Sequence, residues 1–150
     1  MGRIVETLRD HRRVGIDTPV FIYHLEGESR YAGCVADLFS ALAAGSFQGV
    51  TSVLTLMELA VKPLQLGRPE VVDEYEVLLL NYPNLEVVPI DRNTTRRAAE
   101  LRAAHKLRSA DALQVAACWE HGATAFLSND RGLRRVARLE ILPLDDYLED

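Results

Sequence analysis

Four acidic residues of this 150-residue sequence stand out because each lies within a strongly apolar stretch. They are Asp17 after VGI, Glu58 inside LTLMELAV, Asp111 inside SADALQVAA and Asp130 after AFLSN. A buried carboxylate is costly unless it is paired, hydrogen-bonded or bound to a cation. No buried Lys or Arg candidate is evident for all four residues. One shared divalent metal would compensate several of them at once.

A metal site built from these residues would favour a particular ion and a particular reaction. Carboxylates without a His or Cys framework suit Mg²⁺ or Mn²⁺, which keep water ligands for substrate phosphates. Such ions can make hydroxide near neutral pH, orient it in line with a phosphodiester and stabilise the leaving oxygen. Ser128 and Asn129, beside Asp130, could orient that water or hold a phosphate oxygen. Alternatively, they only shape a turn.

Each carboxylate also has a purely structural interpretation. Glu58 could pair with Lys62 one helical turn later, and Asp111 could favour its helix through the helix dipole. Asp17 and Asp130 could simply begin turns at strand ends. We favour a shared site because the predicted fold brings at least two of the four residues to one edge of a sheet.

Short apolar segments alternate with helical patterns along the chain. The predicted strands are 13–16, 47–50, 85–90, 124–128 and 139–144, and the predicted helices are 18–26, 29–45, 52–61, 69–82, 93–107 and 109–122. This alternation predicts parallel βαβ units, and hence an α/β three-layer sandwich with helices on both faces of the sheet. Ligands bind beyond the carboxyl ends of such strands, where Asp17 and Asp130 are predicted to lie.

Capping and helix-breaking residues set the expected helix ends. Thr18 and Ser109 are the predicted N-caps of the helices that they begin. Gly45 and Gly122 are predicted to close helices, and Pro63 to stop the helix before it.

Composition and length limit the class of protein. No repeat, low-complexity tract or long linker divides the chain, so we expect one domain over 1–150. The first residues lack the apolar region of a signal peptide, and there is no run of about 18 apolar residues, so we expect a cytoplasmic protein with no membrane partner. Cys34 and Cys118 are too few and too isolated for a disulfide framework, and we expect reduced core residues.

Charge is unevenly distributed along the sequence. The net charge of -5 argues against a nucleic-acid partner, yet residues 92–138 hold ten Lys or Arg and four acidic residues. This segment is therefore +6 and the remainder is -11. It is either two solvated amphipathic helices or an electrostatic footprint for a phosphate backbone. The candidate contacts to an RNA backbone are Arg131, Arg134 and Arg135.

The chain resembles PIN-domain ribonucleases, specifically the VapC-type toxins of bacterial toxin-antitoxin pairs, in four segments: GIDTPVFIYHLEG, TSVLTLMEL, SADALQVAACWEHGATAFLSND and LEILPL. The resemblance covers about residues 14–144 in order and spacing. It implies a PIN-like five-stranded parallel sheet, an RNA substrate and a homodimer. It also implies a small antitoxin whose C-terminal segment covers the active site.

The same resemblance implies roles for the acidic residues. The family's quartet corresponds to Asp17, Glu58, Asp111 and Asp130. Mg²⁺ or Mn²⁺ would be held mainly by Asp17 and Asp111, with help from Asp130. Glu58 would bind the metal through water or activate the attacking water.

Neighbouring positions both match the family and depart from it. Thr18 and Asn129 match polar neighbours that often lie beside the site. Pro19 stands where relatives are often polar, which removes one ligand-orienting group. A basic, helix-capable extension, residues 1–13, precedes the core, residues 14–144. It would be an added helix, an arm for RNA or antitoxin, or the product of a misassigned start codon.

The leading hypothesis is a metal-dependent endoribonuclease, the toxin of a toxin-antitoxin pair. One alternative is an aspartate-nucleophile phosphatase, prompted by the DT pair after the first strand, but such enzymes usually need a second Asp where this sequence has Pro19. The other is a catalytically silent PIN-fold module for RNA binding or dimerisation. The helix pair over 18–45 is the predicted surface for the antitoxin or second protomer.

Overall fold

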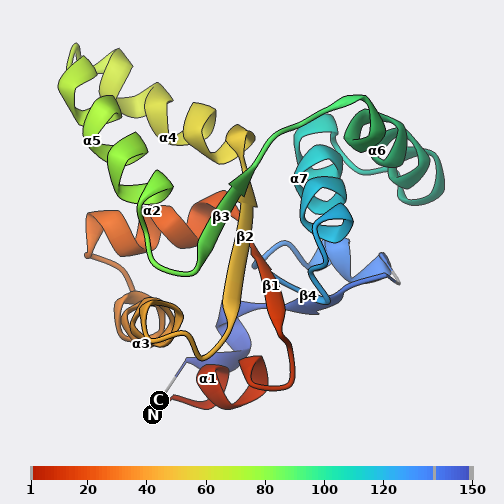
Figure 1. The fold of residues 1–150 in the computed structure, drawn as a ribbon, viewed down its shortest axis with the longest axis horizontal. Helices are drawn as coiled ribbons and strands as arrows, with labels where there is room; N and C mark the ends of the chain where they lie inside the picture. Colours follow the sequence, from red (N-terminus) through yellow and green to blue (C-terminus); the bar gives the residue numbers. More distant parts are fainter. Residues whose placement is uncertain (1, 137, 149–150) are drawn as a thin grey trace.

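The computed structural model describes residues 2–136 and 138–148. A five-stranded, all-parallel sheet forms its centre, in the order β3-β2-β1-β4-β5 (Figure 1). The strands are β1 Arg13–Ile16, β2 Gln48–Ser52, β3 Leu85–Val88, β4 Ala125–Leu127 and β5 Glu140–Leu142. The helices are α1 Arg3–Leu8, α2 Thr18–Glu26, α3 Ala32–Ala43, α4 Val53–Gln65, α5 Pro69–Leu80, α6 Arg92–His105 and α7 Ser109–Glu120, with 3-10 turns η1 Arg131–Arg135 and η2 Leu144–Tyr147.

Helices cover both faces of the sheet. Figure 1 shows α2 and α3 on one side of the strands and α6 and α7 on the other. One apolar core joins α1, α2 and α3 to the sheet, and a second joins α6, α7 and η1 to the opposite face. The central strand β1 is accordingly apolar, with Val14 and Ile16 fully buried. The predicted three-layer α/β class and five-stranded parallel sheet are confirmed.

The strand order creates a switch point beside β1. The chain moves from β1 to β2 and β3 on one side, and β4 and β5 then add on the other side. Asp17 directly follows β1, and Asp130 lies three residues after β4. In open α/β sheets, ligands bind at such a switch, beyond the carboxyl ends of the strands.

A glycine in β1 allows α7 to lie close to the sheet. A Cβ atom at Gly15 would stand 2.6 Å from Cδ1 of Phe126 and 2.9 Å from Cβ of Cys118, which is closer than real Cβ atoms approach. Gly15 therefore permits direct packing of α7 on β1. This packing brings the start of α7, with Asp111, toward the end of β1, with Asp17.

Two predicted N-caps are wrong by one residue. Thr18 is the first residue of α2, and the N-cap is Asp17, whose side chain accepts from the Thr18 backbone N–H at 3.0 Å. Asp17 takes this position because its backbone is extended and its short carboxylate reaches the helix end. Ser109 is likewise the first residue of α7, after Arg108, whose backbone is extended and which makes no side-chain cap bond.

The prediction that Pro63 stops its helix is also wrong, because α4 continues to Gln65. Pro63 lies in the last turn, where the missing N–H removes only one bond of the ladder. Beyond it, the Leu66 N–H still reaches the Lys62 carbonyl at 3.1 Å. The predicted helix closures at Gly45 and Gly122 agree with their positive φ angles of 81° and 87°.

The N-terminal segment contains a packed helix. The apolar side chains of α1, Ile4, Val5 and Leu8, are buried in the same core as α3. Cys118 is buried as predicted, whereas Cys34 is only partly buried at the edge of that core. Within residues 2–136 and 138–148, no helix has the length and apolar character needed to cross a membrane.

Candidate active site

The four predicted acidic residues line one cavity of about 230 Å³ at the carboxyl edge of the sheet. They come from the end of β1, the middle of α4, the first turn of α7 and the loop after β4. The remaining described residues around the cavity are Pro19, Val20, Tyr23, Arg108, Ala110, Gln114, Ser128, Asn129 and Leu144. Among them, Arg108 is the only Lys or Arg, so the cavity is strongly acidic.

Asp17 is the most perturbed carboxyl of the cavity. Its oxygens accept hydrogen bonds from the Thr18 N–H at 3.0 Å and from the Ser128 hydroxyl at 2.7 Å. Burial nevertheless raises the pKa of Asp17 to about 6, with a further contribution from the negative charges of Asp111 and Glu58. The ionised form of Asp17 is therefore less favoured than that of an ordinary carboxyl, and a positive charge in the cavity would stabilise it.

Ser128 connects Asp17 to the loop that carries Asp130. The Ser128 oxygen accepts from the Asp130 N–H at 3.1 Å while its hydroxyl donates to Asp17. Asp130 in turn accepts from the Gly132 N–H at 3.0 Å, which starts η1. Asn129 lines the cavity, but its amide oxygen accepts from the Asp145 N–H at 3.1 Å and so fixes the C-terminal segment.

Glu58 differs from its sequence-based interpretation in two respects. It is exposed rather than buried, because the outward face of α4 is itself apolar and exposed, as at Met57. Its oxygen Oε1 accepts a hydrogen bond from the Thr18 hydroxyl at 2.8 Å. The alternative pairing with Lys62 is wrong, since the Lys62 amine lies 3.1 Å from Glu26 instead.

Asp111 stands in the first turn of α7, where the helix dipole favours a negative charge. Its side chain is 24% exposed and lies 3.2 Å from the guanidinium of Arg108, which is 86% exposed. Exposed ion pairs of this kind contribute little to stability. Arg108 can therefore leave Asp111 at small cost when another cation binds.

The three arginines predicted to contact RNA lie on η1, directly after Asp130. Arg131 and Arg134 pair with Asp146 at 3.3 and 2.9 Å, and Arg135 donates to the Gly132 carbonyl at 3.2 Å. All three are exposed, and none is among the residues that line the acidic cavity. They form a basic rim outside it rather than part of its wall.

The donor set fits a hydrated hard cation. In the described part of the chain, no group of three or more His, Cys, Asp or Glu side chains is placed to hold a metal ion. Mg²⁺ in proteins is typically bound by one or two carboxylates and several waters. Burial and the nearby carboxylates Asp111 and Glu58 raise the pKa of Asp17, and a bound cation would oppose this effect. The residues therefore fit direct ligation by one or two carboxylates, with the others acting through water.

Sequence reasoning missed the polar side chains behind Glu58. Thr51, Thr55 and Gln114 are buried and hydrogen-bonded to one another beneath the cavity. The spacing of Thr51, Thr55 and Glu58 along a helical stripe was visible in the sequence. No local pattern, however, indicates that Gln114 on a distant helix meets this stripe.

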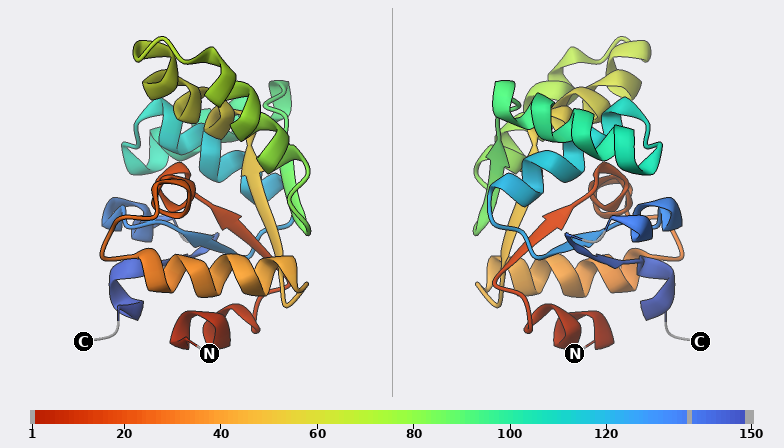
Figure 2. Two further views of the ribbon diagram at one scale, coloured as in Figure 1. Left: turned by 90° about the vertical axis from the view of Figure 1, so that its left-hand side faces the viewer. Right: turned by 90° about the vertical axis from the view of Figure 1, so that its right-hand side faces the viewer.

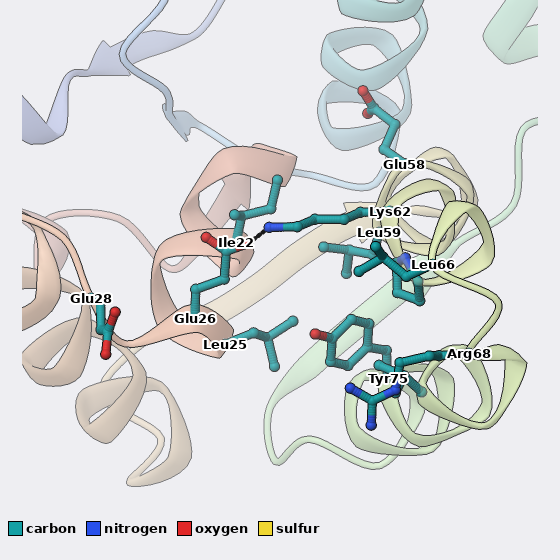
Figure 3. Close-up of a pocket in the computed structure, with 12 residues that line it drawn as sticks. Ile22, Leu25, Glu26, Glu28, Glu58, Leu59, Lys62, Leu66, Arg68 and Tyr75 are labelled. Carbon is teal, nitrogen blue, oxygen red and sulfur yellow. Dashed lines mark hydrogen bonds and ion pairs between the residues drawn. The ribbon is translucent and has the colours of Figure 1, made fainter.

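A second cavity, of about 460 Å³, lies between α2, α4 and α5 and shares Glu58 with the first. Figure 3 shows Ile22, Leu25 and Leu59 inside this groove, with the Glu58 carboxylate pointing away from them. We call this cavity the helix groove. It is formed by Ile22, Leu25, Glu26, Glu28, Glu58, Leu59, Lys62, Pro63, Leu66, Arg68, Val71 and Tyr75.

The α4–α5 pair that forms one wall of the helix groove stands beyond the carboxyl end of β2, as Figure 1 and Figure 2 show together. Both helices also carry large apolar side chains on their outer surfaces. These are Val53, Met57, Val61 and Leu64 on α4, Leu66 just after it, and Val77, Leu78 and Leu80 on α5. Several exposed large apolar side chains on one helix pair are typical of an interaction site.

Comparisons with known proteins agree with this architecture. The structure is similar to VapBC2 from Rickettsia felis bound to a DNA fragment from its promoter, with a TM-score of 0.69 and 16% identity over 87% of this chain and 98% of that one. DNA-bound VapBC from Salmonella typhimurium has a TM-score of 0.65 and 18% identity, over 88% of this chain and 98% of that one. FitAcB from Neisseria gonorrhoeae has a TM-score of 0.66 and 18% identity, over 87% of this chain and 97% of that one.

These structural likenesses establish the fold. Among curated proteins, none matches the chain significantly. The model of the PIN domain family matches residues 14–139, which include all four carboxylates of the acidic cavity. The chain therefore belongs to the PIN domain family.

Proposed function

We propose that the protein is a metal-dependent endoribonuclease that hydrolyses RNA phosphodiesters in the cytoplasm, as the toxin of a toxin-antitoxin pair. The observation that carries this proposal is the meeting of four carboxylates, from four separate elements, in one cavity. Membership of the PIN domain family, whose members are generally nucleases, supports it. The structurally similar VapBC and FitAcB proteins support the toxin assignment.

The residues of the cavity divide the work of this reaction. Asp17 and Asp111, with help from Asp130, would hold Mg²⁺ or Mn²⁺. A bound ion supplies activation of water near neutral pH and stabilises the leaving oxygen. Ser128 orients Asp17 and the Asp130 loop through its two hydrogen bonds.

Glu58 is suited to receive the proton of the attacking water. It is exposed, lines the acidic cavity and is tethered at Oε1 by the Thr18 hydroxyl. A general base must lie within hydrogen-bond reach of the proton that it takes, directly or through one water. We assign Glu58 this role, or that of a metal ligand through water, and Asn129 a supporting role at the cavity edge.

The reaction is tested by incubating antitoxin-free protein with a panel of structured RNAs in EDTA, Mg²⁺ or Mn²⁺. We expect cuts with either metal, none in EDTA, and none with the Asp111→Asn variant. Asp111 is the first-turn carboxylate of α7, and the amide keeps its size while removing its charge. Metal-independent cuts, or full activity of the variant, would contradict the proposal. Tight RNA binding without scission would instead identify a catalytically silent binding module.

The basic rim on η1 is proposed to bind the RNA backbone. Because exposed ion pairs are weak, a phosphate can replace Asp146 beside Arg131 and Arg134. Replacing Arg134 and Arg135 by Gln should weaken RNA binding and reduce the slope of log K against log salt by about 1.4 for a single strand. Binding titrations over a salt series measure this slope.

The matched control for the rim removes two positive charges elsewhere, with Arg12→Gln and Arg68→Gln. Both side chains are exposed and lie outside η1. This control should leave the salt slope of RNA binding nearly unchanged. Equal slopes for the two double variants would remove the rim from the RNA site.

We propose the helix groove as the antitoxin site. The groove is apolar inside and shares Glu58 with the acidic cavity, so a segment bound in it would reach the catalytic carboxylates. Two groove carboxylates, Glu28 and Glu58, would favour a partner that carries Lys or Arg. The sequence predicted that the helix pair over 18–45, now α2 and α3, binds a partner. The helix groove includes α2, but its other helices are α4 and α5 and not α3. The exposed apolar surface of α4 and α5 is the proposed homodimer contact.

A further inference from the structure

Beneath the Glu58 side of the acidic cavity lies a cluster of buried polar side chains. Each of its five members exposes at most 2% of its surface, and they are Thr18, Thr51, Ser52, Thr55 and Gln114. They come from α2, β2, α4 and α7. The cluster therefore joins three helices: α2, which follows Asp17, α4, which contains Glu58, and α7, which contains Asp111.

Gln114 is the member that connects α7 to the beginning of α4. Its Nε2 donates to Thr55 Oγ1 at 2.8 Å and to Thr51 Oγ1 at 3.3 Å. Its Oε1 accepts from the hydroxyl of Ser52. Ser52 is the N-cap of α4 and accepts from the Leu54 N–H at 3.2 Å, so Gln114 holds the first turn of that helix against α7.

Hydrogen bonds connect Gln114 to Glu58 through two hydroxyl groups. An amide nitrogen only donates, so Thr55 accepts from Gln114. The Thr55 hydroxyl oxygen lies 2.9 Å from the Thr18 hydroxyl oxygen. Thr18 donates to Glu58 Oε1 at 2.8 Å. The contacts therefore run without a break from Gln114 through Thr55 and Thr18 to Glu58.

We infer that Gln114 is a positioning residue for Glu58. By donating to Thr55, it fixes the Thr55 hydroxyl, which contacts the Thr18 hydroxyl that holds Glu58 Oε1. This inference rests on the proposed function, in which Glu58 takes a proton from the attacking water or binds metal through it.

Fixing Glu58 matters because its surroundings do little else to hold it. The residue is exposed, and the neighbouring Lys62 is paired with Glu26 instead. A long exposed side chain samples several rotamers unless a specific contact selects one. The contact with Thr18 selects one, and Gln114 orients the hydroxyl that makes it. Gln114 therefore acts on the reaction without touching RNA.

The test compares the Gln114→Met variant with the wild type. Methionine has a similar length and no hydrogen-bonding amide, so the variant removes all three bonds of Gln114. We expect kcat for RNA cleavage to fall by about 10- to 100-fold while KM changes little. An unchanged kcat in a folded variant would overturn the inference.

The matched control is Thr94→Val, which removes a buried hydroxyl from α6. Thr94 is fully buried and donates to Asp91 at 3.0 Å, away from the acidic cavity. Both variants should unfold at lower temperature, because Gln114→Met leaves buried hydroxyls without their partner and Thr94→Val removes a side-chain bond to the N-cap of α6. Only Gln114→Met should lose kcat. A matching loss of kcat in Thr94→Val would show that destabilisation alone explains the effect.

A double-mutant cycle shows whether Gln114 acts through Glu58. Adding Gln114→Met to Glu58→Gln should cause little further loss of residual activity, because the residue that Gln114 positions is already disabled. Full additivity of the two losses would contradict the inference. If the wild type shows no metal-dependent cleavage at all, the proposed function fails rather than this inference.

A spectroscopic measurement tests the same connection without activity. The side-chain amide signals of Gln114 should shift in Glu58→Gln, because Thr18 can then accept a proton and the hydroxyl directions change. They should stay in place in Asp130→Asn, which alters a carboxylate that makes no bond to the cluster. Equal shifts in the two variants, or none in Glu58→Gln, would refute the connection between Gln114 and Glu58.

Discussion

Replacing Asp17 by Asn is expected to reduce metal-dependent RNA cleavage on the order of 1,000-fold, because a bound ion contributes several kcal/mol to the transition state. The amide keeps the size of the side chain and its bond from the Thr18 N–H, so α2 remains capped. Single-turnover cleavage at saturating Mn²⁺ measures the loss. A thermal melt of the same sample verifies that the variant is folded.

The control for this prediction is Asp37→Asn. Asp37 is an exposed residue of α3, and it does not line the acidic cavity. Its variant should cleave RNA like the wild type. Comparable rates for Asp17→Asn and Asp37→Asn would show that the cavity carboxylate has no special part in the reaction.

The second large effect concerns the stability of the metal-free protein as pH changes. The pKa of Asp17 is about 6 in the folded state and 3.8 as an ordinary carboxyl. Between these values the unfolded chain loses a proton that the folded protein retains, so the free energy of unfolding falls as pH rises. Above pH 6 the loss contributed by Asp17 reaches about 3 kcal/mol. Well below pH 3.8 both states are protonated and this loss is absent.

Asp17→Asn removes this ionisation and should therefore stabilise the metal-free protein more at pH 7 than at pH 4. Urea unfolding in EDTA at both pH values, for variant and wild type, gives the difference directly. Saturating Mn²⁺ should reverse the order at pH 7, since an ion present at 1,000 times its Kd stabilises the wild type by about 4.1 kcal/mol, which exceeds the loss from Asp17. An identical difference at both pH values would exclude Asp17 as the titrating group.

Local patterns predicted much of the fold because the elements are strongly periodic and short. The apolar strand around Val14 and Ile16 was readable, since a strand covered on both faces has no polar alternation. The helix ends were harder. Asp17 rather than Thr18 caps α2, and Pro63 sits inside α4, because backbone geometry in the assembled structure decides which neighbouring residue takes each position.

The sequence indicated which acidic residues line the candidate site, but it indicated their exposure and their hydrogen-bond partners only in part. Asp17, Asp111 and Asp130 were found because strand and helix ends converge at one edge of a parallel sheet. The exposure of Glu58 was not predictable, since apolar neighbours such as Met57 are themselves exposed on α4. Gln114 was missed because its partners lie about sixty residues earlier in the chain, on elements that only the fold brings together.

The most direct test is a calorimetric titration of Mn²⁺ into the wild type and the Asp17→Asn and Asp111→Asn variants, with Asp37→Asn as control. The wild type should bind Mn²⁺ with release of protons near pH 6, where Asp17 is partly protonated. Both cavity variants should lose binding, and the control should bind normally. Equal Mn²⁺ affinity in all four proteins would contradict the central claim that these carboxylates meet in order to hold a metal ion.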